Sequence, residues 1–330
     1  MVPGDGWRRR PCPEPGRSSL QREREGNWTS AIPFTDVEAE TWAETWFDTE
    51  WAGLLAATHQ AATWGLYEIA WQLADALRGF AHLRRHWADW ADACRVGRAA
   101  SQQIHDRQAE ARMLFNLGAA SRGLRRSDEA LDCLQQSVAI HREVGDHRGE
   151  GWALGYLGLT YRNLERFDEA LEFFQQALTI HREVGYRYGE GWQLQELGEV
   201  YRYLGRFDEA LGHLQKALDI NRELLDRRGE GWTLGYLGAT YHLLGRFDEA
   251  VDHLQRALAI ARDARYPYGE GLILSYLGLA LQETQDMEAA RSCWRKALVI
   301  FTEIASPEAE HVRALLEGES SGASGPTEWT

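Results

Sequence analysis

The sequence has few of the residues that mark secreted, metal-binding or membrane proteins. Only 4 cysteines and 8 prolines occur among 330 residues, and the cysteines lie far apart, at Cys12, Cys94, Cys133 and Cys293. This usage suits free thiols in a reducing cytoplasm. No apolar run approaches the roughly 18 residues that span a bilayer, and no apolar segment follows the arginines near the N-terminus. We therefore expect a cytoplasmic protein without a membrane segment or signal peptide.

Positive charge and nucleotide-binding motifs are also scarce. Lysine and arginine total 36 against 50 acidic residues, which gives a net charge of −14 at pH 7. Because phosphate binding needs a basic face, nucleic acid is not an expected partner. The phosphate-binding loop G-x-x-x-x-G-K-[S/T] does not occur. Runs of β-branched residues are missing, whereas Leu, Ala, Glu, Gln and Arg are frequent, and this composition predicts an all-α fold.

What the chain does contain is one segment that repeats every 40 residues. The sequence GEGWALGYLGLTYRNLERFDEALEFFQQALTI begins at Gly149, close copies begin at Gly189 and Gly229, and more divergent copies begin at Gln108 and Gly269. A fixed period in this range indicates stacked units, none of which can bury its apolar face alone. Apolar residues at spacings of three and four predict two helices in each unit.

The ends of these helices carry capping signals. We expect Asp168 to cap the second helix of its unit, and Asp146 and Asp226 to cap the first helices of theirs. Tyr186 stands at the corresponding corner of the next unit and has no suitable capping group, so that corner must be held by packing.

Small residues recur where two helices would cross. Gly158, Gly198, Gly238 and Gly278 lie in the middle of the first helices, although each costs up to about 1 kcal/mol relative to alanine. We expect a neighbouring backbone to lie too close for a Cβ atom, with Ala170, Ala210, Ala250 and Ala290 opposite.

The order and spacing of Gly158, Tyr161, Ala170, Phe174 and Ala177 resemble the tetratricopeptide repeat signature. The usual unit has about 34 residues, and the longer unit here resembles that of kinesin-light-chain-like and LGN-like proteins. The resemblance covers about residues 106–305. It implies an all-α, right-handed superhelical solenoid of helix pairs, in which the first helix of each pair lines a concave groove.

We divide the chain into five segments on this basis. Residues 1–27 and 318–330 are rich in Pro, Gly and Ser and are expected to be disordered. Residues 28–105 are expected to form a Trp-rich helical cap with a helix break near Asp48 and one divergent helix pair. Residues 106–305 form the array of five 40-residue repeats, and residues 306–317 form a capping helix. Two stretches of the cap, WFDTEWAGLLAATHQAA and WQLADALRGFAHLRRHWADW, resemble the region after the ATPase module in actinobacterial SARP and NB-ARC (STAND) regulators.

The resemblance places several polar and aromatic residues in the groove. Four residues after the central glycine of each of the first four repeats stand Arg122, Arg162, Arg202 and His242, a basic ladder suited to carboxylates or phosphates. In the alternative interpretation, Glu199 and Glu165 pair with these side chains in a structural charge network. Two residues before the central glycine of each of the five repeats stand Asn116, Tyr156, Glu196, Tyr236 and Tyr276, where LGN-like arrays carry an asparagine that grips a peptide backbone. We add Glu199 and Tyr203 to the predicted groove.

Tryptophans supply a second set of candidates. Eight of the 14 tryptophans fall between Trp28 and Trp90. They form either the core of the cap or, through Trp42, Trp46 and Trp51, an exposed patch for a partner such as a P-loop ATPase. The tryptophans at the repeat starts, Trp152, Trp192 and Trp232, are expected to pack between repeats.

Patterns that suggest chemistry are weak. Residues 318–322 match G-x-S-x-G but lack the strand and helix that a nucleophile elbow needs. His82 and His86 share a helix face without further metal ligands, and the repeated His141 and His181 suggest a solvated face. We therefore predict no catalytic residue, metal or cofactor.

The sequence thus favours a non-catalytic interaction scaffold whose concave groove binds a protein or peptide segment or a small acidic ligand. The alternative is the sensor module of a STAND-class transcriptional regulator without its ATPase domain.

Overall fold

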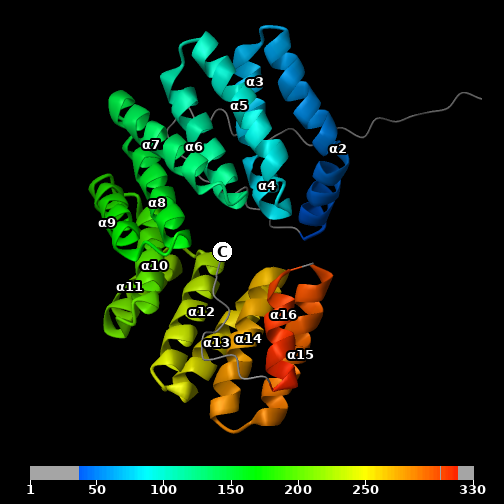
Figure 1. The fold of residues 1–330 in the computed structure, drawn as a ribbon, viewed down its shortest axis with the longest axis vertical. Coiled ribbons are helices and arrows are strands. Elements are labelled where there is room, and N and C mark those ends of the chain that lie inside the picture. Colours follow the sequence, from blue (N-terminus) through cyan, green and yellow to red (C-terminus); the bar gives the residue numbers. More distant parts are fainter. Residues whose placement is uncertain (1–36, 305, 319–330) are drawn as a thin grey trace, which may run out of the picture. The chain divides into compact units, whose positions relative to one another are not determined.

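The computed structural model describes residues 37–304 and 306–318, and the side chains of all these residues from Thr45 onward. The predicted disordered segment 1–27 and residues 319–330 of the predicted tail lie outside this part of the chain, as do Cys12 and most of the G-x-S-x-G match. The chain separates after Gly53 into two units, residues 1–53 and 54–330. Helices make up nearly all of the described chain, and the predicted all-α class is confirmed (Figure 1).

The first described helix, α2 (Val37–Thr63), is continuous, so the predicted break near Asp48 is wrong. No proline interrupts this stretch. The Thr49 hydroxyl donates to the carbonyl oxygen of Thr45 at 2.9 Å, and Thr58 donates to Leu54 in the same way. Both threonines thereby satisfy their hydroxyls inside the helix and leave the backbone ladder intact.

After α2, three more helices precede the repeats: α3 (Tyr67–Ala76), α4 (Arg78–Arg84) and α5 (Trp87–Gln103). The first helix of the expected divergent pair is therefore divided at Leu77. Within this group the ring of His82 lies 4.8 Å from Trp87 and 5.2 Å from Trp90, measured between ring centroids. His82 is thus packed among aromatic rings.

Five helix pairs follow with the 40-residue period seen in the sequence. The first helices of the pairs are α6 (Arg107–Gly123), α8 (His147–Asn163), α10 (Arg187–Tyr203), α12 (Arg227–Leu243) and α14 (Pro267–Glu283). The second helices are α7 (Ser127–Val144), α9 (Phe167–Glu183), α11 (Phe207–Glu223), α13 (Phe247–Asp263) and α15 (Met287–Glu303), and α16 (Glu308–Glu317) ends the array.

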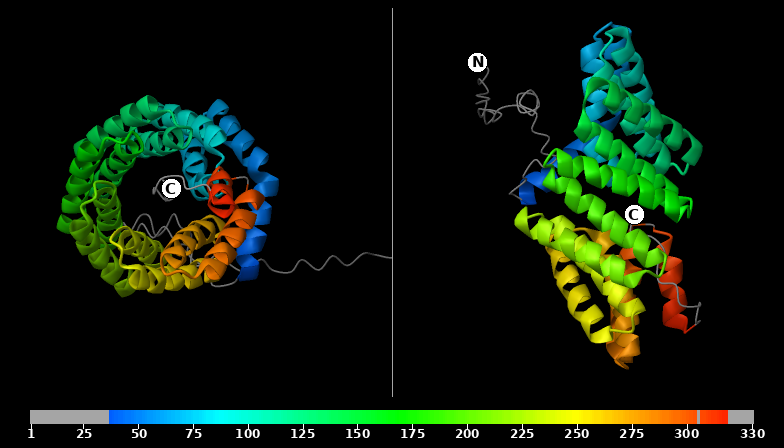
Figure 2. Two further views of the ribbon diagram at one scale, coloured as in Figure 1. Left: turned by 60° about the horizontal axis from the view of Figure 1, so that its bottom comes forward. Right: turned by 90° about the vertical axis from the view of Figure 1, so that its left-hand side faces the viewer.

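Consecutive first helices contact one another, whereas the second helices pack behind them. Within residues 54–318 the first helices lie on the inner side of the curved array and the second helices on its outer side (Figure 2). We call them inner and outer helices. Most residues of each inner helix are buried, whereas the outer helices bury only one stripe. This difference follows from their positions, since an inner helix has neighbours on several sides.

The central glycines lie where the inner and outer helices of a pair meet, but the nearest neighbour is not the expected backbone. A Cβ atom on Gly198 would lie 2.6 Å from Cγ of Leu214 and 3.2 Å from the carbonyl oxygen of Ala210. On Gly158 it would lie 2.7 Å from the ring of Phe174. The large side chain of the outer helix therefore excludes a Cβ first, and the backbone carbonyl is only the next obstacle.

The corners between pairs are capped in two ways. Asp146 and Asp226 accept hydrogen bonds from the backbone N–H of Gly149 and Gly229, both at 2.9 Å, as predicted. Tyr186 caps nothing through its side chain, also as predicted. Asp168 is not an N-cap, because Arg166 occupies that position and Asp168 lies in the first turn of α9.

Each corner is also fastened by an ion pair that spans it. An arginine near the end of an outer helix pairs with a glutamate in the first turn of the next inner helix: Arg142–Glu150, Arg182–Glu190, Arg222–Glu230 and Arg262–Glu270. The N–O distances are 2.6, 2.9, 3.0 and 2.7 Å. Cys94, Cys133 and Cys293 are free thiols. Among the described helices, none is both long and apolar enough to cross a membrane.

Candidate functional site

The inner helices bring two of the predicted rows together. A residue four positions after the central glycine lies one helical turn further along the same face, and it reaches the next inner helix. The guanidinium of Arg122 lies over the ring of Tyr156 at 5.7 Å. In the next repeat, Nη1 of Arg162 lies 2.5 Å from Oε2 of Glu196, 34 residues later. The ladder position of one repeat thus meets the position two before the glycine in the next repeat.

The third ladder residue is held within its own helix. Arg202 donates to both carboxylate oxygens of Glu199, at 3.1 Å from Nε and 2.9 Å from Nη2. Its guanidinium also lies over the ring of Tyr203 at 4.5 Å. Glu199 is itself buried, and the buried Tyr236 and Tyr276 act electrostatically on Arg162 and Arg202, respectively. Six predicted groove residues therefore form one charge cluster, which Tyr276 of α14 joins. They are Arg162 of α8, Glu196, Glu199, Arg202 and Tyr203 of α10, and Tyr236 of α12.

Burial governs the electrostatics of this cluster. Burial raises the pKa of Glu196, and the positive charge of Arg162 opposes that rise. Burial and the negative charge of Glu199 also raise the pKa of Tyr203 and Tyr236, so both phenols remain protonated at neutral pH. Two glutamates therefore neutralise two arginines.

The ladder is consequently not a row of four available cations. The partner of Arg162 is Glu196 and not Glu165, whereas Arg202 pairs with Glu199 as the alternative interpretation proposed. Burial lowers the pKa of His242, so its ring is neutral near pH 7. Among the predicted groove residues, Arg122, Tyr156, Tyr203 and His242 keep part of their surface exposed.

The side-chain amide of Asn116 is not available to bind a peptide backbone, as an asparagine ladder would require. Its Nδ2 donates to Oδ1 of Asp75 at 2.8 Å, and Arg112 pairs with the other oxygen of the same carboxylate. Asn116 is 1% exposed. It joins α6 to α3 and gives the inner surface no free amide edge.

The proposed tryptophan patch is not uniform. Trp46 is 40% exposed, Trp51 is buried, and the side chain of Trp42 lies outside the described residues. Trp152, Trp192 and Trp232 are half-buried, and the centroid of Trp192 lies 5.1 Å from that of Trp152. Trp152 and Trp192 thus contact each other between repeats.

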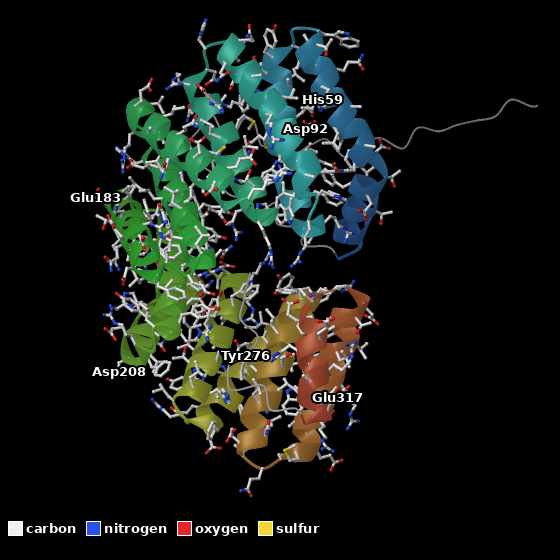
Figure 3. The ribbon with its side chains drawn as sticks, viewed as in Figure 1. His59, Asp92, Glu183, Asp208, Tyr276 and Glu317 are labelled. Atoms are coloured by element: carbon white, nitrogen blue, oxygen red, sulfur yellow. The ribbon has the colours of Figure 1, made fainter. Side chains whose placement is uncertain are left out.

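The expectation of a solvated face at His141 and His181 is wrong. His141 is 2% exposed and lies 3.0 Å from Oδ2 of Asp146, and His181 is fully buried against Gly151 and Gly189. Burial lowers the pKa of His181 to about 4. The adjacent Arg–Glu residues do face solvent, and Glu183 lies at the outer edge of the array (Figure 3). Their exposure says little about the histidine one position earlier, because neighbours on a helix point about 100° apart.

Sequence reasoning missed a set of arginine–aromatic clusters at alternate corners. The guanidinium of Arg148 lies 4.4 Å from the ring centroid of Tyr186, and that of Arg228 lies 5.2 Å from Tyr266. Trp232 lies 5.5 Å from Tyr266. The sequence does contain a signal for these clusters. Tyrosine replaces the capping aspartate at two alternate corners, and an arginine stands nearly one repeat before each of these tyrosines.

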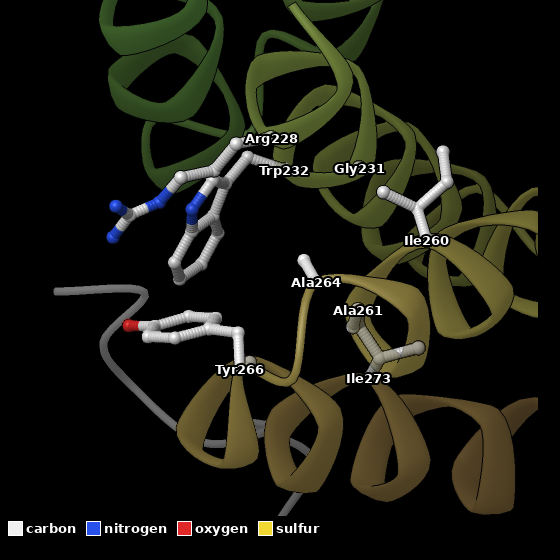
Figure 4. A pocket seen from close by; sticks show the side chains of 9 residues that line it. Arg228, Gly231, Trp232, Ile260, Ala261, Ala264, Tyr266 and Ile273 are labelled. Atoms are coloured by element: carbon white, nitrogen blue, oxygen red, sulfur yellow. The ribbon is translucent and has the colours of Figure 1, made fainter. Parts of the chain in front are cut away.

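The second of these corners borders a small pocket (Figure 4). Arg228, Trp232 and Tyr266 lie on one side, and Gly231 of α12 together with small and apolar residues of α13 and α14 forms the rest of the wall. The lining residues within the described part of the chain are Arg228, Gly231, Trp232, Ile260, Ala261, Ala264, Tyr266, Gly269 and Ile273. Within the described residues, no group of three or more His, Cys, Asp or Glu side chains is arranged to hold a metal ion.

Comparison with known proteins identifies the repeats. The tetratricopeptide repeat family model matches residues 109–183 and 192–263. No curated protein sequence gives a significant match.

Several solved structures share the fold. Aspartyl phosphate phosphatase F from Bacillus subtilis is 14% identical, with a TM-score of 0.60 over 82% of this chain and 75% of that one. A Rap protein complexed with competence and sporulation factor is also 14% identical, with a TM-score of 0.58 and coverage of 77% and 74%. A STAND protein with a tetratricopeptide repeat sensor from Pyrococcus horikoshii is 16% identical, with a TM-score of 0.59, and the match covers 76% of this chain and 39% of that one. Residues 109–183 and 192–263 of the chain are therefore tetratricopeptide repeats.

Proposed function

We propose that the chain is a non-catalytic scaffold that binds a protein or peptide segment on its inner helices. The observation that carries this proposal is the buried charge cluster around Arg162, Glu196, Glu199 and Arg202. Apolar residues would fill the same space at less cost, because desolvating an ion pair often outweighs the attraction between its charges. We infer that the charged groups are retained because they hold the side chains of a binding surface in a fixed geometry.

The cluster fixes side chains that remain partly open. Arg202 stacks on Tyr203, and Arg122 covers Tyr156, so both phenol rings are held by neighbours. Rigid aromatic side chains lose little conformational entropy when a ligand binds, and tyrosine offers both an apolar ring and a hydroxyl. The inner surface therefore suits an extended segment with apolar and polar side chains.

A peptide selection with the full chain tests the proposal. A random peptide library would be selected against the protein, and the dissociation constant of a selected peptide would be measured for two double variants. Tyr156→Ala with Tyr203→Ala alters the inner surface, and Lys216→Ala with Arg256→Ala alters exposed positions of the outer helices. We expect a loss of at least about tenfold for the inner variant only, since each interface tyrosine commonly contributes about 1 kcal/mol or more. Thermal melts by circular dichroism would show that both variants fold.

Binding that survives the inner substitutions and fails after the outer ones would reject the inner surface. If no peptide can be selected at all, the scaffold proposal fails for unfolded segments, and the surface would need a folded partner.

A second candidate is the sensor module of a STAND-class regulator. It is supported by the resemblance of residues 46–62 and 71–90 to such regulators, and the fold is compatible with a repeat sensor. Nucleotide-dependent association of the full chain with a P-loop ATPase from the same organism would support this role. Equal recovery of that ATPase with and without ATP would count against it.

A further inference from the structure

The end of α4 meets the start of α14, the last inner helix of the array. The guanidinium of Arg85, which follows α4, lies 5.3 Å from the ring centroid of Tyr268 in the first turn of α14. Figure 1 shows the end of α4 facing this part of the array. The contact therefore joins the first and last parts of residues 54–318 and closes the array on itself.

This closure is made by side chains and not by packed helices. Helix α4 packs on α3 and α5, and no extensive packing among the described helices joins it to α12, α14 or α16. Tyr268 is buried, and its hydroxyl donates a hydrogen bond to Glu308 of α16 at 2.8 Å. Arg85 is exposed. An exposed arginine thus stacks on a ring that α16 already holds, so the contact can break without disturbing any helix pair.

Like charges face each other across the closure. Arg228 of α12 stacks on Tyr266, with 5.2 Å between the guanidinium and the ring centroid. Burial raises the pKa of Tyr266, and the positive charges of Arg228 and Arg85 oppose that rise, so both arginines act on the same ring. Burial and the charges of three arginines, Arg228 among them, lower the pKa of His82 on α4 to about 3. Positive charges from α4 and α12 are therefore concentrated at the contact.

No ion pair balances these charges within the described residues. Arg78, Arg85 and Arg228 form none there, whereas the nearby Arg222 pairs with Glu230. Repulsion among the three arginines pushes α4 away from α12. The opposing force is the attraction of the Arg85 guanidinium for the face of the tyrosine ring.

Salt changes these two forces unequally. Repulsion between exposed arginines acts through water, and the Debye length that limits its range falls from about 30 Å at 0.01 M salt to about 3 Å at 1 M salt. The stacking of Arg85 on a buried ring acts at contact distance and is screened less. Added salt should therefore strengthen this closure, whereas it would weaken a closure made by exposed ion pairs.

We propose that the contact of Arg85 with Tyr268 is a latch that closes the array, and that repulsion between the arginines of α4 and α12 opens it when the ionic strength is low. Opening separates α4 from α14 and exposes more of the surface that the inner helices line. The latch thereby controls how freely a partner reaches that surface. It is a property of the chain alone and does not depend on the peptide-binding function proposed above.

The test measures one distance across the closure in the full chain without a ligand. The amino acid p-acetylphenylalanine would replace Leu83 of α4 and Val299 of α15, which are 50% and 56% exposed, and would carry nitroxide labels. The native cysteines then remain unlabelled. Double electron–electron resonance should give one short distance at about 1 M salt and a second, longer distance at about 0.01 M salt.

Two neighbouring arginines should act in opposite directions. Arg85→Gln removes the attraction, so the ratio of closed to open molecules at high salt should fall roughly three- to fivefold. Arg228→Gln removes repulsion across the closure, so the longer distance should become less populated at low salt. Arg246→Gln is the control, because it removes the same charge and a stacking contact of 4.6 Å with Tyr241 elsewhere in the array. It should match the wild type at both salt concentrations, and circular dichroism would confirm that all variants fold.

The latch would be rejected if Arg85→Gln gave the wild-type distances at both salt concentrations, or if Arg246→Gln changed them equally. A distance that is independent of salt, or that lengthens at high salt, would overturn the role assigned to arginine repulsion. None of these results depends on whether a peptide binds the inner helices, so the proposed function stands or fails separately.

Discussion

The inner and outer sides of the array use the same arginine–glutamate chemistry in different surroundings. On the outer side, at the start of the outer helix α11, Arg206 and Glu209 pair at 2.5 Å with side chains that are 49% and 44% exposed. On the inner helices, Arg162 and Glu196 pair at the same distance, but their side chains are only 7% and 6% exposed. Water screens the first pair and not the second. The repeated outer pairs therefore contribute little individually, whereas the inner pairs are costly to break.

The largest expected effect separates these two kinds of pair directly. Glu196→Ala leaves Arg162 buried without its partner and should lower the free energy of unfolding by about 3–5 kcal/mol. Glu209→Ala removes the equivalent exposed partner and should change it only slightly. Urea unfolding of both variants measures the difference. Similar losses in the two variants would show that the inner pair is not truly desolvated.

A pH titration of stability tests the buried face of an outer helix. The pKa of His181 is lowered from 6.5 to about 4 by burial. Above pH 6.5 the ring is neutral in both states and its full contribution to stability is present. As the pH falls toward 4, only the unfolded state takes up the proton, so the native state should lose about 2–3 kcal/mol from this group. Well below pH 4, where both states carry the proton, no further loss is expected.

His181→Asn isolates that contribution, since Asn221 occupies the same position in the next repeat. Unfolding free energies at pH 7 and pH 4 should differ less for this variant than for the wild type. Gln175→Asn, on the exposed face of the same helix, serves as the control and should follow the wild type at both pH values. An unchanged pH dependence in His181→Asn would contradict the assignment.

Two glycines give a third contrast between the sides. Gly198→Leu would push side-chain atoms into Leu214 and should cost about 1–3 kcal/mol. Gly212, on the outer helix α11, has open space around it, and a Cβ atom added there would meet no atom within 4 Å. Gly212→Leu should therefore be neutral or stabilise the helix by up to about 1 kcal/mol. Thermal melts of the two variants should shift in opposite directions, and a melting temperature unchanged by Gly198→Leu would show that no close crossing exists there.

The smallest effect concerns the corners. Asp226→Ala removes the side-chain bond to the N–H of Gly229 and should cost about 1 kcal/mol. Asp208→Ala, in the first turn of α11 but not at its cap, should cost less because only the interaction with the helix dipole is lost. Chemical unfolding distinguishes the two, and equal losses would show that the cap bond contributes nothing beyond charge.

The repeat fold followed from the sequence because each unit carries the same apolar stripe, the same central glycine and the same corner. The capping roles of Asp146 and Asp226 followed from residue type alone. The partner of Arg162 did not, because Glu196 belongs to the next repeat and its approach depends on how the inner helices stack. The burial of His181 was missed for a related reason, since its neighbours in sequence are exposed.

The aromatic corners show the same limit. The tyrosines could be recognised as poor caps, but their contacts with Arg148 and Arg228 arise from helices one repeat apart. The contact between Arg85 and Tyr268 depends on how many successive repeats stack, and no single repeat carries a sequence pattern that predicts it.

A crystal structure of the full chain with a selected peptide would test the central claim most directly. We predict that the peptide lies along the inner helices α8 to α14, with the Arg162–Glu196 and Arg202–Glu199 pairs intact beneath it. A peptide bound to the outer helices, or one that has broken those pairs to reach Arg162 or Arg202, would contradict this claim.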